Sequence, residues 1–225
     1  MKIAVFQNFF GQDNHFKLFK ANSLNTLMYC NKYSYDYLNF TNNIDTSRPH
    51  SWSRFLIGKK ILPLFDYVFF LGADCVIMNF EIKLESLIDQ NFDFGICEDP
   101  NGPATDGFWM KNCDFCFKLL DEIYSKVQFK DHGWREQMAF DNTIFSDSPN
   151  DSCNMTSKTL KEEYKNKIKL INFKKFGSHP NFFEKEDFML NTPGYRPENK
   201  HEPFMDSSKF IPEKNGKIFK ERFED

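Results

Sequence analysis

The chain has 225 residues, and its 40% hydrophobic and 27% charged residues are typical of one soluble globular domain, or at most one and a half. A formal charge of −3 argues against a general nucleic-acid-binding protein, which would carry a strongly basic face. The longest apolar run, residues 67–78, is too short to span a membrane and contains Asp74. No signal-peptide pattern opens the chain, so we expect a cytoplasmic protein or one domain of a longer polypeptide.

Apolar strands alternate with amphipathic helices, which predicts an α/β fold with a mostly parallel sheet covered on both faces. The expected strands are residues 2–6, 35–40, 66–71, 92–97, 107–110, 168–173 and 188–190, with a further apolar stretch at 76–78. The expected helices are residues 17–33, 52–64, 84–90, 113–127 and 134–145, and a charge run at 158–169 is expected to be solvated. We predict a single domain over residues 1–195, closed by a turn at 193–194, and a charged tail over 196–225 that wraps it or frays.

The most informative feature is the strand at 66–71, which is followed at once by Gly72, Ala73 and Asp74. Ligands of open α/β sheets bind at the carboxyl ends of the strands. A carboxylate preceded by small residues can reach a metal-bound diphosphate at such a place, because carboxylates and phosphates both bind hard cations such as Mg²⁺ and Mn²⁺. The alternative is that Asp74 only caps or turns the chain.

Several segments around this turn resemble one known family. They are, in chain order, LNTLMYCNKY at 24–33 with YDY at 35–37, SWSR at 51–54, DYVFFLGADCVIMN at 66–79, TDGFWMKNC at 105–113 with LLD at 119–121, WREQ at 134–137 and DFMLNTPG at 187–194. Each is similar to a segment of the retaining galactosyl-, xylosyl- and mannosyltransferases of plants and fungi. The resemblance implies the GT-A fold, a Rossmann-type sheet flanked by helices, and a glycosyltransferase activity.

On the nucleotide side, the resemblance implies contacts to a nucleotide-diphosphate sugar, with UDP favoured and GDP next. Gln7 and Asn8, after the first strand, would meet the base or ribose. Phe9 could stack on a base or sugar, although loop packing is the commoner use of such a ring. Arg54 would contact phosphate, for which a guanidinium offers two parallel donors. The acceptor would be a hydroxyl of a glycan or glycoprotein.

On the sugar side, the resemblance places Thr105, Asp106 and Gly107 against the donor sugar. Glu136 and Gln137 would lie under the anomeric carbon, where a polar group stabilises an oxocarbenium-like transition state. Retention of configuration is implied, while a covalent intermediate and same-face delivery of the acceptor both stay open. Trp109 and Trp134 flank these segments and are candidate platforms for a sugar ring.

Two positions depart from the family at the metal site. The resemblance makes Asp74 the ligand of Mn²⁺ or Mg²⁺, but the family's first motif acid is Gly72 here and its late histidine is Asn191. His179 could replace that histidine, although a histidine in a loop is more often only hydrogen-bonded. Three alternatives follow: a weak metal site, a metal-independent transferase, or a nucleotide-sugar-binding module without catalysis.

The six cysteines show no disulfide-framework spacing and are expected to be reduced thiols. Cys113 and Cys116 lie one helical turn apart, but no second Cys or His pair follows at zinc-site spacing. Nothing marks Cys75 as an activated nucleophile. The enrichment in Phe, with 28 residues, is typical of an AT-rich genome such as that of a large DNA virus or a microbe.

Overall fold

The computed structural model describes residues 1–9, 14–99, 102–147 and 158–192. In these ranges the strands are β1 (Ile3–Asn8), β2 (Asp36–Phe40), β3 (Tyr67–Leu71), β4 (Cys75–Ile77), β5 (Phe94–Asp99), β6 (Gly102–Lys111), β7 (Ile168–Asn172) and β8 (Met189–Asn191). The helices are α1 (Asn14–Tyr33), α2 (Ser53–Ile61), α3 (Asp114–Ser125), α4 (Arg135–Ile144), α5 (Glu162–Lys165) and α6 (Phe173–Phe176). The predicted turn at 193–194 and the tail at 196–225 lie outside the described residues.

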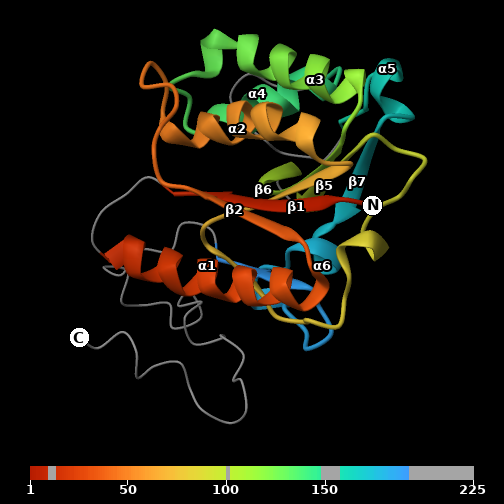
Figure 1. Cartoon of the computed structure of the whole chain (residues 1–225). Helices are drawn as coiled ribbons and strands as arrows, with labels where there is room; N and C mark the ends of the chain where they lie inside the picture. The colour runs from red at the N-terminus through yellow and green to blue at the C-terminus, as the bar shows by residue number, and fades with distance from the viewer. Residues whose placement is uncertain (10–13, 100–101, 148–157, 193–225) are drawn as a thin grey trace.

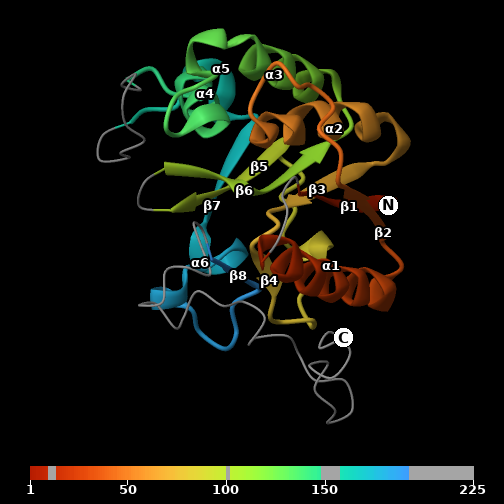
Figure 2. The same cartoon turned by 90° about the vertical axis from the view of Figure 1, so that its left-hand side faces the viewer.

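The elements form three layers, with one large sheet between two layers of helices. Its six strands have the order β2-β1-β3-β6-β5-β7, and β4 pairs with β8 in a separate small sheet. Helices α2, α3 and α4 cover one face of the large sheet, while α1 and α6 cover the other (Figure 1). The turned view shows the β4–β8 pair beside α1 on that second face (Figure 2). None of the helices in the described ranges is long and apolar enough to cross a bilayer.

The large sheet is parallel except at one strand. β1 pairs in parallel with β2 and β3, and β5 with β7, whereas β6 is antiparallel to β3 and β5. The prediction of a mostly parallel sheet is therefore confirmed. Because β6 runs backwards, its first half lies beside the carboxyl end of β3, with Gly107 opposite Leu71. We call this border of the sheet, where β1 and β3 end and β6 begins, the carboxyl edge.

Strand side chains alternate between two apolar cores. In β3, Val68 and Phe70 belong to the core under α2, α3 and α4, whereas Phe69 and Leu71 belong to the core on the α1 side. Both sets are fully buried. A strand covered on both faces has no polar side to show, which is why this segment is apolar throughout.

Three segments differ from prediction. The helix expected at 84–90 is only a 3₁₀ turn at Leu84–Ser86, since an isolated short helix gains too little to offset its nucleation. β6 begins at Gly102 instead of residue 107, because its first residues pair with β5 beyond a bulge, and this pairing outweighs their weak strand propensity. The charge run is not solvated at its start, where Lys158 is buried with its Nζ 2.7 Å from Oδ2 of Asp141.

Candidate active site

The turn after β3 is held by hydrogen bonds from both neighbouring strands. The Gly72 N–H donates to the carbonyl oxygen of Asp106 on β6 (2.8 Å), and the Gly72 carbonyl accepts from Nε2 of Gln7 on β1 (3.1 Å). The other end of the Gln7 amide is also engaged, because its Oε1 accepts from the Tyr37 hydroxyl (2.8 Å). The Gln7 side chain is fully buried. The sequence predicts that Gln7 contacts the nucleotide, whereas its amide in this structure holds the turn that carries Asp74.

A side chain at position 72 would require neighbouring side chains to move. A Cβ atom built on Gly72 would lie 2.8 Å from Oδ1 of Asp74, 3.2 Å from Cβ of Asp106 and 3.2 Å from Sγ of Cys75. Close-packed interiors do not absorb such contacts without movement of a neighbour. Glycine at this position is therefore matched to the presence of Asp106 on the adjacent strand.

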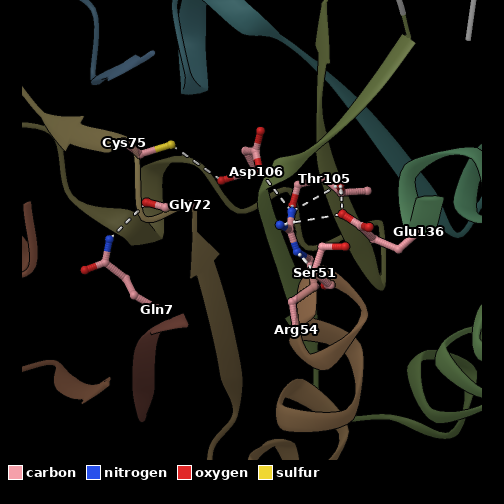
Figure 3. A network of polar contacts seen from close by, with 8 residues as sticks. All are labelled: Gln7, Ser51, Arg54, Gly72, Cys75, Thr105, Asp106 and Glu136. Carbon is pink, nitrogen blue, oxygen red and sulfur yellow. Dashed lines mark hydrogen bonds and ion pairs between the residues drawn. The ribbon is translucent and has the colours of Figure 1, made fainter. Parts of the chain in front are cut away.

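Arg54, in the first turn of α2, is the centre of the polar cluster in Figure 3. Its Nη1 donates to the carbonyl oxygen of Thr105 (2.7 Å) and to Oδ1 of Asp106 (2.9 Å). Its Nη2 lies 3.6 Å from Oε1 of Glu136, which is in the first turn of α4. The exposed fraction is 12% for the Arg54 side chain and 7% for that of Glu136, so this is a largely buried ion cluster. The structure thus brings together four predicted site residues from three separate segments of the chain.

The surroundings of Arg54 fix both its position and its charge. Its Nε donates to the carbonyl oxygen of Ser51 (3.1 Å), and its guanidinium carbon lies 4.8 Å from the centre of the Phe70 ring. Burial alone would lower the pKa of Arg54, but Glu136 and Asp106 outweigh it and raise that pKa above its ordinary value. Arg54 therefore serves as the counter-ion of two carboxylates.

Asp74 lies half-buried beside this cluster. Burial, followed by the negative charge of Asp106, raises the pKa of Asp74 to about 7, against the opposing effects of Arg54 and His179. The Thr192 hydroxyl, just after β8, donates to the Asp74 carbonyl (2.8 Å) and fixes its backbone. Two neighbouring carboxylates repel each other, and a divalent cation beside them would relieve that repulsion.

The side-chain atoms near Asp74 that could coordinate a metal ion are mainly oxygens. Asn191 is on β8 opposite the start of β4, and its Oδ1 is buried with no hydrogen-bond partner in the described part of the chain. Nε2 of His179 lies 3.2 Å from Oδ2 of Asp99, so the histidine is engaged with a different carboxylate. Among the described residues, no group of three or more His, Cys, Asp or Glu side chains is arranged to hold a metal ion. The side chains that fit a hard cation are Asp74, Asp106 and the amide oxygen of Asn191.

Two predicted residues are buried in the core. Trp109 is fully buried on β6, and a Cβ atom built on Gly95 would lie only 2.2 Å from its indole. The expectation that Trp109 is a sugar platform is therefore wrong, because side-chain alternation turns position 109 toward the α1-side core. Gly107 is also buried, and a Cβ atom there would lie 3.1 Å from the ring of Phe176, so it supports packing behind the site.

The remaining predicted residues lie at the ends of β1 and the start of α4. Asn8 ends β1 with its Oδ1 buried and without a partner in the ranges described. The Phe9 ring stacks on Phe19 with centroids 4.8 Å apart, which favours the packing alternative for it. Gln137 is half-buried on α4, and Trp134, directly before that helix, is 43% exposed. Trp134 remains a candidate platform for a sugar.

Sequence reasoning missed residues that support the site from outside the motifs. Asn22, buried on α1, donates from Nδ2 to the carbonyl oxygen of Ala73 (2.8 Å). His50 lies close enough to the cluster that its pKa is lowered, first by burial and then by Arg135 and Arg54. The only sequence signal for these two residues is that each lies next to a segment with the family resemblance. Asn22 precedes the segment at 24–33, and His50 precedes the segment at 51–54.

Comparison with known proteins rests on structure alone. The sequence matches no family model, and no curated protein matches it. One similar solved structure is a glycosyltransferase involved in the glycosylation of the major capsid of PBCV-1, with a TM-score of 0.64, 10% identity, and coverage of 87% of this chain and 95% of the other. Another is the WbbM bifunctional glycosyltransferase, with a TM-score of 0.55, 11% identity, and coverage of 95% of this chain and 50% of the other.

A third similar structure is a variant of Drosophila β1,4-galactosyltransferase 7 in complex with manganese, UDP-Gal and xylobiose. It has a TM-score of 0.50, 10% identity, and coverage of 96% of this chain and 82% of the other. At such identities the likeness concerns the fold and not the specificity. The mixed, mostly parallel sheet flanked by helices has the GT-A-like fold of these glycosyltransferases.

Proposed function

We propose that this protein is a glycosyltransferase that moves a sugar from a nucleotide-diphosphate sugar to a hydroxyl of a glycan or glycoprotein. The observation that carries the proposal is the meeting of Asp74, Asp106, Glu136 and Arg54 at the carboxyl edge of the sheet. Ligands of α/β sheets bind at this edge. The GT-A-like fold, shared with proteins that are glycosyltransferases, supports the same reading.

Asp74, Asp106 and Asn191 would hold the cation, Mn²⁺ or Mg²⁺. When bound, such a cation neutralises the negative charge that develops on the diphosphate as the glycosidic bond breaks. The residues contribute oxygen ligands, and Asp74 must lose its proton before it can bind the metal. Since its pKa is about 7, we expect metal affinity to rise between pH 6 and 8.

The base of the donor would lie at the end of β1. The Oδ1 of Asn8 is a buried acceptor whose partner is not found in the described residues, and the N–H of a uracil or guanine ring could supply it. The UDP-Gal bound in the Drosophila neighbour favours UDP over GDP. Ala73, whose side chain is a single methyl group, would let the diphosphate approach the turn.

Glu136 would act on the sugar. Its Oε1 lies 3.4 Å from the Thr105 hydroxyl and 3.6 Å from Nη2 of Arg54, so the carboxylate is held before substrate arrives. A fixed negative charge stabilises oxocarbenium character at the anomeric carbon without reorganisation during the reaction. Gln137 would assist from the same turn of α4. Retention of configuration is supported by the sequence resemblance and is tested by the anomeric configuration of the product, measured by NMR.

A thermal-shift panel tests donor binding, with UDP, GDP, TDP and CMP each measured in Mn²⁺, Mg²⁺ or EDTA. A ligand at one hundred times its dissociation constant stabilises the folded state by about 2.7 kcal/mol, which corresponds to about 5–10 °C for a chain of this size. We expect UDP with Mn²⁺ to give the largest shift. Asp74→Asn and Asp106→Asn should each abolish the metal-dependent part, while Asp121→Asn, at an exposed ion pair, should keep it.

Turnover of the donor tests the activity itself. Wild-type protein should release UDP from a UDP-sugar in the presence of an acceptor, and Glu136→Gln should reduce this release by roughly 10²–10³-fold with the thermal shift retained. An equal shift in EDTA would instead indicate a metal-independent site. Nucleotide binding without any turnover would identify a silent binding module, and no binding of any nucleotide would overturn the proposal.

A further inference from the structure

Two cysteines, Cys113 and Cys116, follow the C-terminal end of β6. Cys113 directly precedes α3 in an extended conformation (φ −155°, ψ 158°), and Cys116 lies in the first turn of that helix. The chain between Asp106 and Cys113 spans about 20 Å when extended, so this pair takes no part in the candidate active site.

The two cysteines are close together but differ in exposure. Their sulfur atoms are 3.9 Å apart. Cys113 is half-buried, whereas Cys116 is fully buried, with its Sγ 3.1 Å from the carbonyl oxygen of Asp93. While both thiols are protonated, Cys113 donates to the Cys116 sulfur and Cys116 donates to the Asp93 carbonyl. Once Cys113 is a thiolate it can only accept, and Cys116 becomes the donor.

The start of α3 favours a thiolate at Cys113. The hydrogen bond with Cys116, helped by the backbone N–H groups of Cys116 and Phe115, lowers the pKa of Cys113 to about 6 against the opposing effect of burial. The same hydrogen bond, and then burial, raise the pKa of Cys116 above its ordinary value. An accessible thiolate at a helix N-terminus, followed three residues later by a buried thiol, is the arrangement used in thiol–disulfide exchange.

The other described cysteines lack this combination. Cys30, Cys75 and Cys97 are buried, and burial is the main cause that raises the pKa of each, to about 12 for Cys30. A zinc site does not account for the pair either, because no cluster of metal-binding side chains is found around it in the residues described.

We propose that Cys113 and Cys116 form a redox-active dithiol, which small disulfides of the glutathione type oxidise reversibly to an intramolecular disulfide. The Cys113 thiolate attacks one sulfur of glutathione disulfide, which forms a mixed disulfide and releases one glutathione. The Cys116 thiol then gives its proton to solvent and attacks the Cys113 sulfur, which releases the second glutathione. The dithiol loses two electrons, the glutathione disulfide is reduced, and the sulfur atoms close from 3.9 Å to about 2.05 Å by side-chain rotation.

Redox titration followed by alkylation tests this. The full chain is equilibrated in buffers of increasing ratio of oxidised to reduced glutathione, free thiols are blocked, and peptides are identified by mass spectrometry. We expect one disulfide, between Cys113 and Cys116, that is reversed by reduced glutathione. Cys116→Ser should accumulate a glutathione adduct on Cys113, and Cys113→Ser should prevent both products. Cys153→Ser is the matched control and should behave as wild type.

The alkylation rate of Cys113 in the wild-type protein, measured against pH, is a second test. The reaction rate of Cys113 should rise with a midpoint near the pKa of about 6. The midpoint should move up by about one unit or more in Cys116→Ala, since the thiolate loses its side-chain hydrogen bond. The proposal is overturned if Cys113 titrates near the free-thiol value of about 8.5, or if both thiols stay reduced in buffers that oxidise thioredoxin.

Discussion

The two edges of the large sheet handle charge in opposite ways. At the amino edge, where β1, β3, β5 and β7 begin, the carboxylates are matched by neighbouring donors, and the lysines among these donors reach solvent. The backbone N–H of Lys2 donates to Asp66 (2.6 Å), and Asp93 lies 2.8 Å from Nζ of Lys167 and 3.6 Å from Nζ of Lys111. Both lysine side chains are at least 40% exposed.

At the carboxyl edge, the cation is largely buried and the charged groups are unequal in number. Arg54 faces Asp106 and Glu136, and the charge of Asp74 adds to theirs. The amide oxygen of Asn191 there is unsatisfied within the described residues. Burying polar groups without full compensation costs stability, and such groups are instead available to a ligand. The difference supports our proposal that the carboxyl edge binds a charged substrate while the amino edge serves the fold.

The largest expected effect comes from removing a cation, and we compare one removal at each edge. Arg54→Met leaves Asp106 and Glu136 buried without their counter-ion, so we expect a loss of about 3–5 kcal/mol in the free energy of unfolding. Lys167→Met removes an exposed partner of Asp93 and should cost less than about 1 kcal/mol. Urea denaturation measures both. Equal losses at the two edges would contradict the comparison.

Restoring the missing acid tests how tightly the carboxyl edge is packed. Gly72→Asp should destabilise the protein by roughly 1–3 kcal/mol, because its Cβ would meet Asp74 and Asp106. Gly72→Ala separates this steric effect from that of charge. In Asp106→Ala the cost of Gly72→Asp should fall, with a coupling of about 0.5–3 kcal/mol in a double-mutant cycle. Full tolerance of Gly72→Asp in the wild-type background would refute the packing argument.

The pH dependence of stability probes Asp74 in metal-free protein. Its folded pKa of about 7 lies above its unfolded value, so the folded state binds more protons, and the stability from this group falls as the pH rises from about 4 to 7. Asp74→Asn should remove this fall, which we expect to be about 1–2 kcal/mol after solvent screening of a half-buried group. Urea titrations at pH 5 and 8 in EDTA measure it. Parallel pH profiles for the two proteins would show that Asp74 ionises normally.

The smallest expected effect is a gain in stability from a substitution at the amino edge. Ser34 has a φ of 59° at the end of α1, where the Tyr35 N–H donates to the Cys30 carbonyl (3.0 Å), as in a Schellman motif. Glycine adopts this conformation without strain, so Ser34→Gly should stabilise the protein by about 0.5–1 kcal/mol with donor binding unchanged. Thermal denaturation checks this, with Ser34→Ala expected to give no gain.

Much of the fold could be predicted because its signals are local. The continuous apolar run of β3 and the helical spacing of α3 are each written in one segment. The predicted strand at 107–110 is shorter than β6, because the first residues of β6 form a strand only by pairing with β5. The burial of Lys158 could not be foreseen either, because its partner Asp141 lies on another helix.

The candidate site could be predicted residue by residue but not as an assembly. Asp74, Arg54 and Glu136 were each identified from short segments. That Arg54 pairs with Asp106 depends on how α2 packs over β1 and β3 and on β6 lying beside β3, and no single segment encodes that. The crowding around Gly72 likewise depends on the register between β3 and β6.

The backward direction of β6 has a consequence for how such sites are recognised. Because β6 enters the sheet at the border where β3 leaves it, positions 72 and 106 are spatial neighbours although they are far apart along the chain. An acidic group can thus be supplied from either strand to the same place. A search of the sequence for two acids separated by one residue would pass over this chain, although Asp74 follows β3 and Asp106 lies on the neighbouring strand β6.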